Sequence, residues 1–213
     1  PVMDFGLNDK PPVVLLLGPD LQAVSGVSTH LNLLFGSALA QVYELKHFQV
    51  GSEGRNEHAL GRLLRLLISP FALARQIIAD RVAVVHLNTS LNRRAFWRDL
   101  VYLIVAKLAG VHVVYQVHGG DLPEQFAGSK PFMKAVLRTA LGLPDAIVVL
   151  AKCELEAYRN FVPQQDIQLL ANAIDHLAYA DLPREANPSQ EELRLLYIGR
   201  LSREKGLYEA LQG

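Results

Sequence analysis

The chain has 213 residues, half of them apolar, with 21 basic and 21 acidic residues. These totals predict one large folded domain, or one domain with part of another, and the balanced charge gives no indication of nucleic-acid binding. The single cysteine, Cys153, excludes an internal disulfide and fits a reducing compartment. Because no apolar run approaches the ~18 residues of a membrane span, we expect a cytoplasmic protein.

Strand and helix patterns alternate along the chain. Continuous apolar runs predict buried strands, and a weaker alternating pattern predicts an edge strand at residues 42–50. The expected buried strands lie at residues 13–17, 82–87, 111–117 and 146–150, with a short one at 167–170. Helices are expected between them, over residues 31–39, 60–78, 93–108, 131–141 and 152–161.

This alternation predicts an α/β fold: a Rossmann-like parallel sheet with helices on both faces. Within the helix at 60–78, Pro70 should break or kink the helix, or start a new one. In the helix at 93–108, five apolar residues are expected to share one face: Phe96, Leu100, Leu103, Ile104 and Leu108.

The composition changes near residue 181. Residues 181–192 are rich in proline, polar and acidic residues, which indicates a linker. Residues 193–198 then predict a new strand, and 207–212 the start of a helix. One strand and one short helix cannot form a core. We therefore expect residues 1–180 to form an N-terminal domain and residues 193–213 to open a second domain that is incomplete in this chain.

Positive charge is concentrated in the middle of the chain. Residues 55–138 hold 12 basic and 5 acidic residues. Such an excess suggests an anionic partner, such as phosphates or lipid headgroups, although basic helix faces in contact with water explain it equally well. Five arginines lie near apolar helix positions, which would allow contact with an anionic membrane surface: Arg62, Arg65, Arg93, Arg94 and Arg98.

Polar residues follow several predicted strands, where ligands bind in open α/β sheets. After the first strand, residues 25–30 form a glycine loop that leads into a helix, whose unpaired N–H groups suit phosphate. Residues 88–90 (Asn-Thr-Ser) and 118–121 (His-Gly-Gly-Asp) follow two later strands. The alternative interpretation is that these are ordinary turns and helix caps.

Several common catalytic motifs are missing. The sequence has no Gly-x-Gly-x-x-Gly, Walker A, Gly-x-Ser-x-Gly or His-Glu-x-x-His motif, and one cysteine cannot form a thiolate zinc cluster. These absences argue against a dinucleotide-dependent dehydrogenase, a P-loop NTPase, a serine hydrolase or a zinc protease.

Five short motifs, in this order, resemble the retaining glycosyltransferases of family 4, which have the two-domain GT-B architecture. Residues 25–30 are similar to the family's Gly-Gly-Val-x-x-His loop, and residues 86–88 to its His-x-His or His-x-Asn strand end. Residues 118–119 match a His-Gly step, and residues 172–175 resemble an Asn-Gly-Val/Ile-Asp turn. Residues 199–206 match the Gly-Arg-Leu…Lys-Gly motif that opens the second domain. Ser25 and Ala173 stand where the family has glycine.

The resemblance implies roles for individual residues. A nucleotide-sugar donor would bind between the two domains, with Arg200 and Lys205 neutralising its diphosphate and Gly26 allowing close approach. His118 and Asp121 are the catalytic candidates. Four further residues are candidates for contact with the acceptor or the transferred sugar: His30, His86, Asn88 and Gly119. Neither a cofactor nor a metal is expected.

The resemblance also implies a function in polysaccharide or glycolipid synthesis, with a saccharide or lipid-linked acceptor. The family's second domain carries two glutamates eight residues apart, and this chain has no such pair. We therefore expect residues 1–213 alone to lack transferase activity. Two alternatives stay open: a sugar-nucleotide epimerase of GT-B architecture, and a non-enzymatic module that binds an acceptor or the inner face of a membrane.

Overall fold

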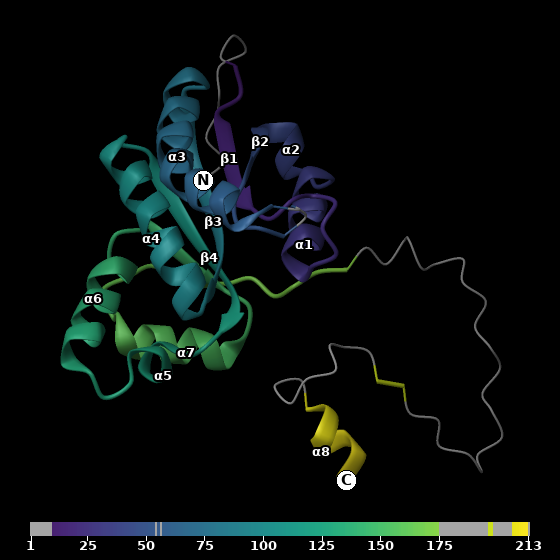
Figure 1. Ribbon diagram of the computed structural model, residues 1–213, viewed down its shortest axis with the longest axis vertical. Coiled ribbons are helices and arrows are strands. Elements are labelled where there is room, and N and C mark those ends of the chain that lie inside the picture. The colour runs from purple at the N-terminus through teal and green to yellow at the C-terminus, as the bar shows by residue number, and fades with distance from the viewer. Residues whose placement is uncertain (1–9, 54, 56, 175–195, 198–205, 213) are drawn as a thin grey trace, which may run out of the picture. The chain divides into compact units, whose positions relative to one another are not determined.

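The structure is a computed structural model that describes residues 10–53, 55, 57–174, 196–197 and 206–212 (Figure 1). The chain divides after Ile174 into two compact units. In the second unit the described helix is α8 (Leu207–Gln212). The predicted linker at 181–192 and the two phosphate-binding candidates Arg200 and Lys205 lie outside the described residues.

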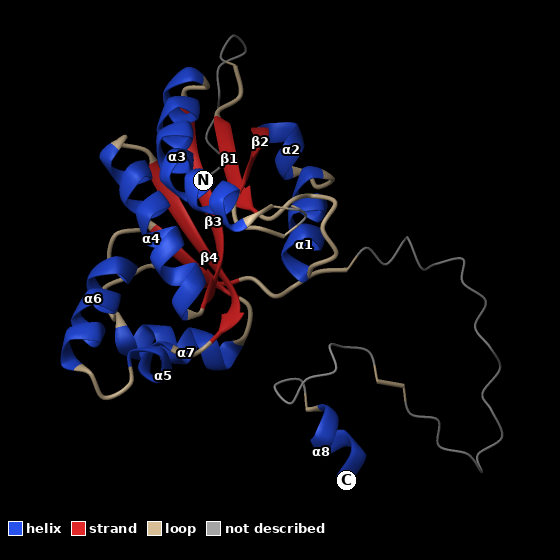
Figure 2. Ribbon diagram, viewed as in Figure 1, coloured by secondary structure: helices blue, strands red, loops and turns tan. Residues whose placement is uncertain are grey.

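The first unit is built on a six-stranded parallel sheet (Figure 2). Its strands are β1 (Val13–Gly18), β2 (Glu44–Gln49), β3 (Val82–Leu91), β4 (His112–Gly120), β5 (Ala146–Val149) and β6 (Ile167–Leu169). They lie in the order β2-β1-β3-β4-β5-β6. The predicted Rossmann-like α/β fold is therefore confirmed, and the alternating segment at 42–50 is the edge strand β2.

Helices cover both faces of the sheet. Figure 1 shows α3 (Ala59–Ala79) and α4 (Arg93–Leu108) on one side, with α1 (Gly26–Phe35) and α2 (Leu39–Val42) on the other. The remaining helices of this unit are α5 (Pro123–Ala127), α6 (Pro131–Leu141) and α7 (Lys152–Phe161). Of the described helices, none is long and apolar enough to cross a bilayer.

The central strand β1 shows how the core forms. All six of its residues are buried, as expected for a strand with helices on both faces. Leu15 and Leu17 belong to the same core cluster as Leu73 of α3, whereas Val14 and Leu16 pack with Leu31 of α1. Each fully buried leucine contributes ~1.5–3 kcal/mol, so β1 holds both helical layers onto the sheet.

Three local predictions were wrong in whole or in part. Helix α3 continues through Pro70, so the proline neither breaks the helix nor starts a new one, and a kink at Pro70 stays a prediction. In α4, Ile104 and Leu108 are exposed, so the expected apolar face is buried only in part. The strand expected to stop at residue 117 continues to Gly120, and β3 likewise continues to Leu91, because these two ends pair with each other.

Candidate functional site

Five polar side chains gather near the carboxyl ends of β3 and β4. His86 and Asn88 are two residues apart on β3, as are Gln116 and His118 on β4, so each pair shares a face of the sheet. Leu16 of β1 pairs with His86, and Asn88 pairs with Gln116. This register puts all four on the face that α1 covers, and α1 contributes His30.

Hydrogen bonds fix the protonation pattern of His118. Its Nε2 lies 2.8 Å from Asn88 Oδ1, and the Asn88 amide donates through Nδ2 to the Leu17 carbonyl, 3.1 Å away. Because an amide oxygen only accepts, His118 donates from Nε2. Its Nδ1 therefore carries a lone pair in the neutral ring. His86 donates in the same way from Nε2 to Gln116 Oε1, at 2.9 Å.

The three histidines are held in the neutral form. Burial, together with the neighbouring His30 and His86, lowers the pKa of His118 to about 3. Burial lowers the pKa of His86 to about 4, against the opposing hydrogen bond to Gln116. Burial also lowers the pKa of His30, and the Gln116 side chain opposes that shift. At neutral pH the cluster can exchange hydrogen bonds with a ligand but supplies no fixed positive charge.

His30 adds an aromatic wall and an unpaired polar atom. Its ring meets the His118 ring edge-on, with 4.8 Å between the ring centroids. His30 Nε2 and Gln116 Nε2 are both buried and have no hydrogen-bond partner among the described residues. Buried polar atoms without partners are uncommon in folded proteins, and a catalytic or binding role can account for them. These two nitrogens therefore keep hydrogen-bonding capacity that no described residue uses.

Two glycines after His118 complete the end of β4. Gly119 has φ +98° and Gly120 has φ +108°, a region that favours glycine. A Cβ on Gly120 would lie 2.5 Å from the Leu91 carbonyl oxygen, whereas a Cβ on Gly119 would meet nothing within 4 Å. The predicted glycine loop is thus the last part of a strand, and Gly120 is required by the close approach of β3.

Gly120→Ala should therefore destabilise the domain more than Gly119→Ala. Both changes place a side chain at positive φ, which costs ~1–3 kcal/mol, but only the first also forces β3 and β4 apart. We expect urea unfolding to show a loss of about 3 kcal/mol or more for Gly120→Ala and about half of that for Gly119→Ala. Equal losses would show that the contact with Leu91 is unimportant.

Asp121 lies at the exposed end of β4. Its backbone N–H donates to the Leu91 carbonyl at 2.9 Å, which extends the pairing of the two strands. Its side chain is exposed and has no hydrogen bond or ion pair with any residue that the structure describes. The structure thus gathers His30, His86, Asn88 and His118 but leaves the Asp121 carboxylate outside their hydrogen-bond network.

Gly26 begins α1, directly after the N-cap residue Ser25, whose Oγ accepts a hydrogen bond from the Ser28 N–H at 3.2 Å. A Cβ on Gly26 would meet nothing within 4 Å, so no close internal packing requires a glycine here. Open space beside the first turn of α1 is compatible with the predicted approach of a ligand. His30 lies one turn further along the same helix, and its ring contacts His118 of the cluster.

A cavity of about 270 Å³ opens at the carboxyl ends of β1 and β3. Asn88 lines it together with Gly18, Thr89 and Ser90. Three arginines also line it, from the helices on the face of the sheet opposite to α1: Arg62 of α3, and Arg94 and Arg98 of α4. The polar cluster is therefore joined, through Asn88, to a space with basic walls.

A buried carboxylate fixes one of these arginines. Asp99 is fully buried and accepts from Thr89 Oγ1 at 2.5 Å, and from Arg98 Nε and Nη2 at 2.6 and 2.9 Å. Burial raises the pKa of Asp99, while Arg98 and Thr89 oppose that shift. The two-pronged contact is the strong geometry for an arginine–carboxylate pair. It leaves Arg98 Nη1 facing Gly51, where a Cβ would come within 3.0 Å.

A comparison with known protein families shows the family to which this chain belongs. A family profile described as "Glycosyl transferase 4-like domain" matches residues 38–173, which is more than half of the chain. The chain belongs to the glycosyl transferase 4-like family. The predicted relationship to family 4 glycosyltransferases is confirmed. No curated protein sequence matches this glycosyl transferase 4-like domain.

Two solved structures resemble this glycosyl transferase 4-like domain. One is HepE from Anabaena in complex with UDP and glucose, with 12% identity, a TM-score of 0.44, and coverage of 78% of this chain and 46% of that one. The other is UGT73P12 from Glycyrrhiza uralensis complexed with glycyrrhetinic acid 3-O-monoglucuronide, with 8% identity, a TM-score of 0.44, and coverage of 75% and 48%. This chain thus spans about half the length of each.

Sequence reasoning missed several residues of the site in this glycosyl transferase 4-like domain. Gln116 was given no role in the predicted site, although its position two residues before His118 places it on the same face. The pair of Arg98 and Asp99 was also missed, because neighbouring residues on a helix do not normally face each other. Here Arg98 folds back onto Asp99 at the point where α4 meets β3.

Proposed function

We propose that this chain is the acceptor-side, N-terminal domain of a retaining glycosyltransferase with GT-B architecture. The whole enzyme would move a hexosyl group from a nucleotide-sugar to a saccharide or lipid-linked acceptor, in polysaccharide or glycolipid synthesis. Family membership supports the reaction class. The observation that carries the site is the neutral His118, oriented by Asn88 at the carboxyl end of β4.

The neutral His118 suits a positioning task. Its Nε2–H is used by Asn88, so its Nδ1 is the atom that would accept a hydrogen bond from a sugar hydroxyl. His30, His86 and Gly119 would shape the same wall, and the exposed Asp121 is the second catalytic candidate. A sugar held in one orientation loses less entropy on reaching the transition state.

Residues of the second domain would neutralise the negative charge of the diphosphate leaving group. When the bond between the sugar carbon and the phosphate oxygen breaks, the acceptor oxygen forms the new bond to the sugar carbon, its proton passes to the departing diphosphate, and negative charge develops on that diphosphate. We propose that Arg200 and Lys205 neutralise this charge, with Gly26 allowing close approach, and that the reaction needs no metal or other cofactor. Fixed cations aimed at developing charge are an effective means of catalysis.

We further propose a cytoplasmic enzyme that works at the inner face of a membrane. The support comes from α3, which exposes many large apolar side chains beside its arginines. Contiguous apolar surface of this kind usually marks an interaction site. Arginines that flank it would favour an anionic lipid surface.

The test is a transfer assay on a longer protein in which this chain is joined to a complete second domain of the kind that we propose. We expect transfer of a radiolabelled sugar from a nucleotide-sugar to a membrane-extracted acceptor, with the anomeric configuration of the donor retained. The chain of residues 1–213 should show no transfer. Transfer by purified 1–213 would contradict this domain assignment, and conversion of the donor to an epimer without transfer would identify an epimerase instead.

A further inference from the structure

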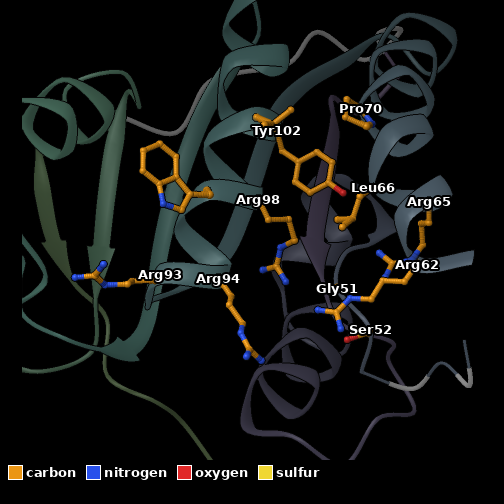
Figure 3. Close-up of a pocket in the computed structure, with 12 residues that line it drawn as sticks. Gly51, Ser52, Arg62, Arg65, Leu66, Pro70, Arg93, Arg94, Arg98 and Tyr102 are labelled. Atoms are coloured by element: carbon orange, nitrogen blue, oxygen red, sulfur yellow. The ribbon is translucent and has the colours of Figure 1, made fainter. Parts of the chain in front are cut away.

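A second, larger cavity adjoins the cavity at the sheet edge. Its volume is about 550 Å³, and it lies between α3 and α4 (Figure 3). The two cavities share five lining residues: Gly51, Ser52, Arg62, Arg94 and Arg98. A ligand that contacts Asn88 in the smaller cavity can therefore continue past the arginines into the groove between the helices.

The shared part of the two cavities is positively charged. Arg62 and Arg94 are exposed, and neither has an acidic group within 4.0 Å among the described residues. Figure 3 shows Arg62 and Arg98 pointing toward the space near Gly51. The larger cavity is lined by five arginines and by no acidic residue among those described, and Glu53 is the acidic residue lining the smaller one. Such a site favours a ligand with a phosphate or diphosphate group.

The groove beyond the arginines is apolar. Leu66 and Pro70 of α3 line one side, and Trp97 and Val101 of α4 line the other. Leu67 and Phe71, which follow Leu66 and Pro70 on α3, are 61% and 77% exposed. An apolar groove beside a helix with exposed apolar side chains fits a long hydrocarbon chain rather than a saccharide, which would need hydrogen-bonding walls.

We propose that the groove binds the acceptor through a phosphate-linked lipid. The phosphate or diphosphate would lie on Arg62, Arg94 and Arg98, and the lipid chain would run between α3 and α4. The saccharide would extend past Asn88 toward His118. This inference rests on the proposed function and narrows its acceptor to a lipid-linked, phosphate-bearing saccharide. A nucleotide-sugar could place its diphosphate on the same arginines, but it has no apolar chain for the groove.

The single tryptophan of the chain reports on the groove directly. Trp97 is 49% exposed and lines the larger cavity, so its fluorescence emission should shift to shorter wavelength when an apolar chain covers it. Residues 1–213 would be titrated with dodecyl phosphate below its micelle concentration. Parallel titrations would use inorganic phosphate, UDP and the uncharged dodecyl maltoside.

We expect dodecyl phosphate to bind at least about tenfold more tightly than inorganic phosphate, because burial of about two methylene groups is worth that factor. The double variant Arg62→Ala/Arg94→Ala should weaken binding of dodecyl phosphate by about tenfold or more. Arg75→Ala is the matched control, since Arg75 is exposed on α3 but lines neither cavity. It should leave the affinity unchanged.

Three results would overturn the inference. They are equal affinity for dodecyl phosphate and dodecyl maltoside, equal affinity for dodecyl phosphate and UDP, or binding of dodecyl phosphate that the double variant does not weaken. These measurements need no donor and no turnover. If dodecyl phosphate does not bind as expected, the proposed transfer reaction is unaffected. If dodecyl phosphate binds as expected but the longer protein transfers no sugar, the proposed function is contradicted and the binding groove is not.

Discussion

Replacing Asp99 with alanine should destabilise the domain by ~3–5 kcal/mol, the usual loss when one partner of a buried ion pair is removed. Asp99 is the single acceptor for three hydrogen bonds, from Thr89 and from two nitrogens of Arg98. Its removal leaves the buried Thr89 hydroxyl without this partner and the Arg98 guanidinium without its counter-charge. Urea unfolding followed by circular dichroism would measure the loss.

The control for this change is Glu124→Ala. Glu124 forms an ion pair with Lys134 at 2.5 Å, but its side chain is 58% exposed. Surface changes of this kind usually alter stability by no more than ~0.5 kcal/mol. A loss for Asp99→Ala as small as the loss for Glu124→Ala would show that the buried network does not hold α4 against the sheet.

Replacing His118 with alanine in the longer enzyme should lower turnover by about ten- to a hundredfold while leaving the fold intact. This range follows from the ~1–3 kcal/mol lost when a hydrogen-bonding partner is removed from an enclosed polar site. His118 is joined to the fold by its bond to Asn88 and by its contact with His30, and neither belongs to the hydrophobic core. The assay is sugar transfer at saturating donor, with thermal unfolding as the check on folding.

His112→Ala is the matched control for this experiment. His112 is the first residue of the same strand and is 77% exposed, so it lies beside Asp145 at the end of β4 opposite to His118. Its loss should leave turnover unchanged. If His118→Ala kept full turnover, or lost no more than His112→Ala, the cluster would have a structural role only, and the residues that orient the sugar would have to lie elsewhere.

Local patterns were sufficient to predict most of the sheet. The apolar runs of β1 and β3 and the alternating pattern of β2 each depend on neighbours close in sequence, and the structure has strands at all three. The end of β4 could not be predicted in the same way. Two glycines normally indicate a turn, and only the pairing of Gly120 with Leu91, a long-range contact, keeps them in the strand.

The candidate site was predictable only in part, because some of its residues are brought together by long-range packing. Asn88 and His118 follow from the rule that parallel strands bring their carboxyl ends together, whereas His86 was predicted only through the family resemblance. His30 reaches them only because of the way α1 packs on the sheet. The arginine-lined groove requires Arg62 on α3 and Arg94 on α4 to face one space, and the sequence contains no signal for how two helices approach each other.

The order of the strands has a consequence for synthesis of the protein. β3 pairs with β1, and each strand made after β3 pairs with the strand made just before it: β4 with β3, β5 with β4 and β6 with β5. The sheet can therefore grow at a single edge as the chain leaves the ribosome, with no earlier strand having to separate. Helix α1 and the first four strands, which together carry His30, His86 and His118, are complete before β5 and β6 emerge, so this wall can form without waiting for the rest of the polypeptide.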